Sequence, residues 1–157
     1  MRLTLPALAL SVALSLAAPV LAADASVESR LQARGVKYEV DKDGDYKITY
    51  SFSEEKRTHL LFVSGSTEEV GGLQVRQIFA PVARVAGNAV TGEMALGLLR
   101  ENQGYKLGAW EISGDILYFV ARIPDSVDAT GLEQLMDIVA SIADDKEIEL
   151  TGAKDEF

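Results

Sequence analysis

The sequence of 157 residues predicts one α+β domain in which helices pack on a mainly antiparallel sheet. Three observations indicate this class. Apolar and polar residues alternate over 46–52, which is typical of a half-buried antiparallel strand. Turns that contain glycine and aspartate, at 41–45 and 114–115, separate pairs of such segments. Apolar residues recur at helical spacing over 132–143. The expected element order is α-β-β-β-β-α-β-β-α.

A short helix is expected first, over 27–34. Val27 and Leu31 lie one turn apart, Ser26 is the expected N-cap, and Gly35 follows at the position where helices often end in left-handed backbone. A meander of four strands should follow, because apolar residues alternate or cluster between turns. The strands are expected at 36–40, 46–52, 59–63 and 73–81, the last one ending at Pro81.

The second half begins with a helix over 92–102 that Thr91 should cap and whose inward residues should be Met94, Leu98 and Leu99. A hairpin of strands 107–113 and 116–123 follows, and the second strand is so apolar that it should be central. Thr130 and Glu133 have the spacing of a capping box at the start of the last helix. That helix is expected to end at 144–146.

The N-terminus has the pattern of a secretory signal peptide over 1–22. Arg2 precedes an apolar run, and small residues follow near the expected cleavage site. Cleavage after Ala22 or after Ala25 fits this pattern. An uncleaved anchor fits less well, because the apolar run is shorter than the roughly 20 residues that a spanning helix needs. The mature chain is therefore expected in the periplasm or outside the cell, with no membrane attachment after cleavage. It should consist of a domain over 26–147 and an acidic tail over 148–157.

The composition excludes several classes of function. The chain has 24 acidic and 15 basic residues, a formal net charge of −9 and no cysteine. This charge disfavours binding to nucleic acid, and the absence of cysteine excludes disulfides, thiolate metal sites and a cysteine nucleophile.

No pattern of residues indicates a catalytic, cofactor-binding or metal site. An EF-hand loop beginning at Asp41 would need glycine and glutamate where Tyr46 and Phe52 stand, so 41–45 is interpreted as a turn. His59, the only histidine, is expected to make an ordinary hydrogen bond within a strand. Three pairs of neighbouring carboxylates are expected to be solvated: Glu54 with Glu55, Glu68 with Glu69, and Asp144 with Asp145. We therefore expect a protein that is not an enzyme and has no cofactor.

The aromatic residues Tyr105, Trp110 and Tyr118 surround the second hairpin. Aromatic residues in strands usually pack in the core or across strands. Stacking on a sugar or a peptide is the alternative interpretation.

Several segments together resemble the YbjN family, which is described as bacterial sensory transduction regulators. They are the helix that ends at Gly35 followed by Tyr38 and Asp43-Gly44-Asp45, and the segments 98–102 (Leu-Leu-Arg-Glu-Asn), 107–111 (Leu-Gly-Ala-Trp-Glu) and 139–144 (Val-Ala-Ser-Ile-Ala-Asp). The resemblance spans about 26–147. It implies a fold like that of type III secretion chaperones, binding to protein, frequent dimerisation and no enzymatic activity. The signal peptide departs from the family pattern.

We therefore expect an exported, non-catalytic protein-binding or regulatory module of YbjN-like type. Its protein partner and the residues that bind it are not identified by the sequence, and a homodimer is a further expectation. The alternative is a periplasmic protein that binds a small molecule or glycan through the aromatic residues near Trp110.

Overall fold

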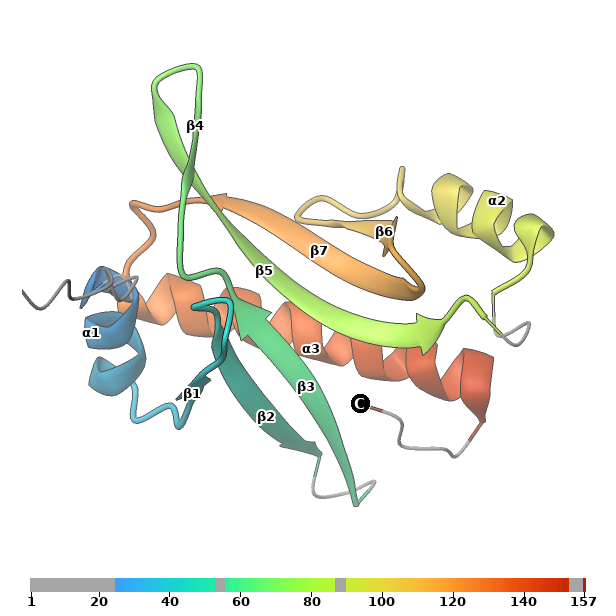
Figure 1. The fold of residues 1–157 in the computed structure, drawn as a ribbon, viewed down its shortest axis with the longest axis horizontal. Helices are drawn as coiled ribbons and strands as arrows, with labels where there is room; N and C mark the ends of the chain where they lie inside the picture. Colours follow the sequence, from blue (N-terminus) through green and yellow to red (C-terminus); the bar gives the residue numbers. More distant parts are fainter. Residues whose placement is uncertain (1–24, 53–55, 87–89, 153–156) are drawn as a thin grey trace, which may run out of the picture.

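The computed structural model describes residues 25–52, 56–86, 90–152 and 157. The predicted signal peptide therefore lies outside the described residues. The elements are α1 (Ala25–Ala33), β1 (Glu39–Val40), β2 (Tyr46–Phe52), β3 (Arg57–Val63), β4 (Glu68–Val70), β5 (Leu73–Arg84), α2 (Gly92–Glu101), β6 (Ala109–Ser113), β7 (Ile116–Pro124) and α3 (Ala129–Thr151) (Figure 1).

The described strands form one antiparallel sheet, so the predicted α+β class is confirmed. The strand order is β1-β2-β3-β5-β7-β6, with β4 paired to the first residues of β5. β7 lies between β5 and β6, as its apolar sequence predicted. β4 was not predicted, because its exposed glutamates show no apolar alternation. Gly71 and Gly72, both at positive φ, form the turn that joins β4 to β5.

α3 lies across one face of the sheet and covers the core (Figure 1). Its buried apolar residues follow helical spacing, as the sequence predicted: Leu132, Met136, Val139, Ala140 and Ala143. On the sheet, Tyr46 and Ile48 of β2 alternate with more exposed residues, which confirms the predicted face. α1 packs against α3 at one end of the sheet. The domain thus has one helix-covered face and one more open face.

Several predicted boundaries are wrong. The N-cap of α3 is Asp128, whose carboxylate accepts a hydrogen bond from the Gly131 N–H at 2.8 Å, rather than Thr130. α3 continues to Thr151, so the expected start of the tail at 148 lies inside a helix. Ser26 lies inside α1. Of the expected strand 36–40, only Glu39–Val40 is β-structure.

A cluster of charged residues joins α1 and β5 to the segment between β7 and α3. Arg76 of β5 is fully buried, and its Nε donates to Asp125 Oδ1 at 2.8 Å. Arg30 of α1 reaches the same oxygen at 2.7 Å and also donates to the carbonyl of Val127. Arg76 also donates to the carbonyl of Ser64, which follows β3. Burial acts to raise the pKa of Asp125, but the two guanidinium groups outweigh it and hold that pKa below its usual value.

Candidate partner-binding site

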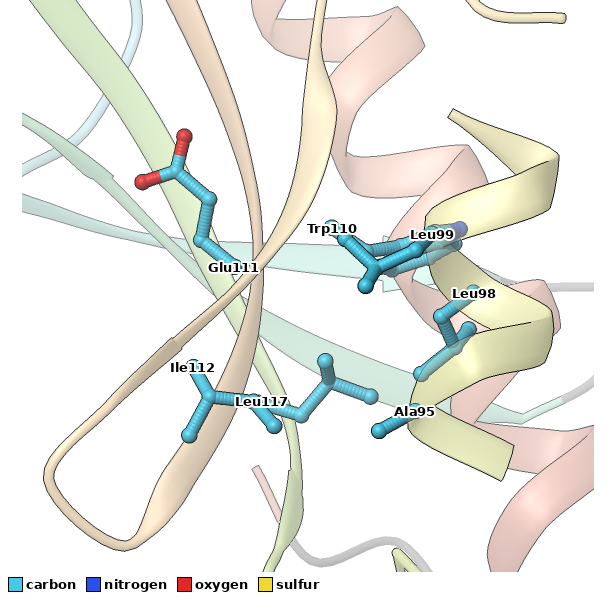
Figure 2. Close-up of a pocket in the computed structure, with 7 residues that line it drawn as sticks. All are labelled: Ala95, Leu98, Leu99, Trp110, Glu111, Ile112 and Leu117. Atoms are coloured by element: carbon cyan, nitrogen blue, oxygen red, sulfur yellow. The ribbon is translucent and has the colours of Figure 1, made fainter. Parts of the chain in front are cut away.

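An apolar groove lies between α2 and the hairpin of β6 and β7 (Figure 2). Its volume is about 370 Å³. Seven residues line it: Ala95, Leu98, Leu99, Trp110, Glu111, Ile112 and Leu117. Figure 2 shows the Glu111 carboxylate turned away from α2, and Arg122 Nη2 donates to it at 2.9 Å. The side chains that face each other across the groove are therefore apolar.

Local sequence explains the position of α2. The Thr91 hydroxyl accepts a hydrogen bond from the Met94 N–H at 3.3 Å, so the predicted N-cap is confirmed. At the other end of α2, Asn102 accepts the Trp110 N–H at 2.7 Å and donates to the Trp110 carbonyl at 3.3 Å. These two bonds attach the end of the helix to β6 and hold the two walls of the groove together. The sequence identified Asn102 only as a helix end.

Two apolar side chains that line the groove, Leu99 and Ile112, are exposed to solvent, and so are Leu96 of α2 and Leu107 before β6. Leu96, Leu99, Leu107 and Ile112 each expose between 48% and 62% of their surface. Leu99 was expected to face inward, so that expectation is wrong, whereas Leu98 is buried as predicted. Single exposed leucines are common on proteins, but large exposed apolar side chains in the lining of an apolar groove are typical of a binding surface.

Trp110 belongs to the core beneath the groove. It is 4% exposed, and its ring packs edge-on against Phe119 and Tyr105, with centroids 4.8 and 5.8 Å away. The indole N–H donates to Glu101 Oε2 at 3.2 Å. Tyr118 does not join this group, since it packs against Phe79 of β5. The interpretation of these aromatics as packing residues is confirmed, and little of the Trp110 ring remains for a sugar to stack on.

A second cluster of polar residues lies between β3 and α3. Arg57 Nε donates to Asp144 Oδ1 at 3.1 Å, and Arg57 Nη2 donates to Glu147 Oε2 at 2.6 Å. His59 is fully buried, and its Nδ1 lies 3.4 Å from Glu147 Oε2 and 3.8 Å from Asp144 Oδ1. Neither ring nitrogen makes a hydrogen bond to a described residue, so the expected ordinary hydrogen bond of His59 is wrong.

Asp144 was expected to be solvated, and the structure corrects this too. Asp144 and Glu147 are buried because they lie one turn apart on the inner side of α3, where Arg57 neutralises them. One nitrogen of His59 and one oxygen of each acid lie within 4.8 Å of one another, which is close enough to hold a cation. Arg57 already donates to the same two carboxylate oxygens, so a cation would have to compete with it.

The other sequence candidates lie in ordinary surroundings. In the turn at 41–45, Asp41 Oδ1 accepts the N–H groups of Asp43 and Asp45, and Gly44 has a φ of 87°, which confirms the turn. Glu68 and Glu69 are exposed on β4, as expected. Glu54 and Glu55 lie outside the described residues.

Comparison with protein-family models finds no match to this chain, and comparison with curated proteins also finds none. The resemblance to the YbjN family therefore stays a prediction. Among the described helices, none combines the length and the apolar character that crossing a membrane requires.

Proposed function

We propose that this protein is an exported, non-catalytic module of YbjN-like type that binds a protein partner through the groove between α2 and the β6–β7 hairpin. The observation that carries the proposal is the exposure of two large apolar side chains that line this groove, Leu99 and Ile112. Burial of such side chains is the main source of affinity at the centre of a protein interface. A partner that inserts apolar side chains between α2 and β6 would bury these two side chains.

The arrangement of the titratable groups supports a non-catalytic role. A general base must reach the substrate, and the only histidine of the sequence is fully buried beneath α3. The buried acids beside it, Asp144 and Glu147, are held by Arg57. Export rests on the predicted leader, and the mass of the secreted chain would distinguish cleavage after Ala22 from cleavage after Ala25.

Site-specific photocrosslinking tests the proposal with a matched control. Leu99 and Leu73 are 62% and 61% exposed, but Leu73 lies at the start of β5, away from the lining of the groove. A benzophenone amino acid at position 99 should form one discrete protein adduct in the cells of origin, and the same probe at position 73 should form none. Adding Ile112→Asp to the position-99 probe should abolish the adduct. Equal labelling at both positions, or no adduct at position 99, would overturn the proposal.

Self-association is the simplest form of this binding. A second copy could cover the same leucines, so we expect the mass from light scattering to rise toward a dimer at high concentration. Leu99→Asp should return it to a monomer, whereas Leu73→Asp should not.

Small-molecule or glycan binding is a second candidate. The groove volume of about 370 Å³ lies within the usual range for ligand pockets, and Trp110 contributes to its wall. Because Trp110 is the only tryptophan, its fluorescence reports on this site alone. A saturable change on adding glycans or small apolar ligands, lost in Ile112→Asp, would support the candidate. An unchanged spectrum across the panel would remove it.

A further inference from the structure

The sheet separates between β3 and β5. In the described part of the chain, these strands pair only at Phe62 with Phe79 and at Val63 with Ile78. By contrast, β3 pairs with β2 along its whole length, from Arg57 to Val63. The N–H of Leu60 in β3 donates to Phe157, far along the sequence. We call the place of Phe157 the β3–β5 cleft. Leu60, Arg84 and Glu147 contact Phe157 there, and Phe62 and Phe79 line the adjoining cavity.

Phe157 occupies the cleft. The Leu60 N–H donates to the main-chain oxygen of Phe157 at 3.0 Å, and the Phe157 N–H donates to Glu147 Oε1 at 3.2 Å. The guanidinium carbon of Arg84 lies 5.7 Å from the centre of the Phe157 ring, within the range of a cation–π contact. Figure 1 places the end of the chain beside β3, next to the last turns of α3. The cleft therefore holds the backbone donor, the backbone acceptor and the aromatic ring of one residue.

A cavity of about 260 Å³ continues from Phe157 over the open face of the sheet. Aromatic side chains form part of its wall: Phe62 stacks on Phe79 at 5.2 Å, and Phe79 meets Tyr118 edge-on at 6.0 Å. The carboxylates of the turn at 41–45 line another part. A bound peptide longer than one residue would thus contact both an aromatic surface and an acidic one.

The acidic part of this cavity favours a basic ligand. Burial, together with the charges of Asp41 and Asp43, raises the pKa of Asp45, although its hydrogen bond from the Gly65 N–H opposes the shift. Burial is the largest cause of the raised pKa, and repulsion from Asp41 and Asp43 adds to it, although Lys42 pairs with Asp43 at 2.6 Å. A lysine or arginine side chain placed beside these carboxylates would relieve that repulsion.

We propose that the β3–β5 cleft binds an extended peptide with an aromatic residue next to lysine or arginine, and that Phe157 competes for the aromatic position from within the chain. The peptide backbone would replace Phe157 as the acceptor of the Leu60 N–H, and so add to β3 as in other cases of strand addition. Its aromatic side chain would take the place of the Phe157 ring beside Arg84. Its basic side chain would face Asp41, Asp43 and Asp45. This site is separate from the groove beside α2.

Peptide binding to the wild type and to Phe157→Ala tests the proposal. The probe is a fluorescent seven-residue peptide with one phenylalanine followed by two lysines, and its anisotropy is measured at low salt. Because an attached competitor acts at a high effective concentration, Phe157→Ala should bind the probe at least about tenfold more tightly than the wild type. Replacing the phenylalanine of the probe by alanine, or its lysines by glutamates, should each weaken binding at least about tenfold.

Two controls locate the site. The double variant Asp41→Asn with Asp43→Asn should bind the lysine probe more weakly. Its affinity for a probe with two glutamines in place of the lysines should be unchanged. Ile112→Asp, in the groove beside α2, should leave the affinity for both probes unchanged. Peptide binding in the cleft and partner binding in the groove are therefore tested separately, and one can fail without the other. In the ¹⁵N spectrum of Phe157→Ala, the probe should shift the Leu60 amide signal.

Three outcomes would overturn the proposal. The first is equal affinity of wild type and Phe157→Ala for the probe. The second is loss of probe binding in Ile112→Asp. The third is a wild-type dimer that Phe157→Ala converts to a monomer, because the cleft would then belong to Phe157 of a second copy.

Discussion

The two ends of the β3–β5 pair differ in how they use buried charge. At the closed end, where the strands pair, Asp125 is held by Arg30 and Arg76, and these two guanidinium groups also bond to backbone carbonyls. At the open end, where the strands separate, Arg57 is shared by Asp144 and Glu147. One carboxylate thus meets two cations at the closed end, and two carboxylates meet one guanidinium at the open end.

We infer from this difference that the two ionic clusters have different roles. The closed end connects α1 and β5 with the segment between β7 and α3, so we infer that it acts as a structural lock. At the open end, Glu147 also receives the N–H of Phe157, and His59 lacks a hydrogen bond to any described residue. We infer that the lock stabilises the fold, while the open end can exchange its contacts for those of a ligand.

The largest effect should come from Asp125→Ala. It leaves the fully buried Arg76 without its carboxylate, and breaking a buried pair from one side costs about 3–5 kcal/mol. Urea denaturation followed by circular dichroism measures the free energy of unfolding. Asp43→Ala is the control, because the pair of Asp43 with Lys42 is exposed and should contribute little. A loss below about 1 kcal/mol at Asp125 would show that the closed end is not a lock.

The pH dependence of the stabilisation by Asp125 should be the next largest effect. The folded-state pKa of Asp125 is depressed, so its stabilisation is present above the usual aspartate pKa of about 3.9 and is lost as the pH falls through the depressed value. The wild type should therefore be more stable than Asp125→Asn at neutral pH, and this difference should shrink below about pH 4. If the difference in the free energy of unfolding stayed constant from pH 6 to pH 3, the pKa of Asp125 would not be depressed.

At the open end, Glu147→Gln should cost about 1–2 kcal/mol in the free energy of unfolding. The amide keeps the volume and one acceptor oxygen, and Arg57 retains Asp144. Of the two hydrogen bonds that the Glu147 carboxylate accepts, from Arg57 and from the Phe157 N–H, one can therefore be kept. Glu149→Gln is the matched control, because Glu149 is exposed on the same helix. If Glu147→Gln destabilised the protein as much as Asp125→Ala, the two ends would be equivalent and the comparison would fail.

The smallest effect should be local. Phe157→Ala should change the global free energy of unfolding by less than about 1 kcal/mol, but it should speed hydrogen exchange at the Leu60 amide several-fold. The Ser64 amide at the closed end, which donates to Gln77, is the internal control and should be unchanged. Faster exchange at both amides would show that the ends open together.

Much of the fold could be predicted from local patterns. The alternation in β2, the turn at 41–45, the hairpin around Gly114 and the stripe on α3 were recognised because each depends on neighbouring residues. The candidate groove was recognised only in part. Leu98 and Trp110 were identified, but the exposed position of Leu99 and the bonds of Asn102 depend on the angle between α2 and the hairpin.

The end of α3 shows why other features could not be predicted. Asp144, Asp145 and Lys146 have the polarity of a helix end, yet the helix continues because Arg57, 87 residues away from Asp144 in sequence, neutralises the inward-facing acids. Arg76 was likewise assigned no buried role, because its partner Asp125 lies 49 residues further along the chain.

The sequence by itself determined the α+β class and most of the strands and helices of this protein, because backbone preference and apolar periodicity act between near neighbours. Only the tertiary structure decided which charged residues are buried, where the sheet separates and which leucines remain exposed. Each of these features depends on partners that are distant in the sequence, and a buried charge is stable only where such a partner is brought to it.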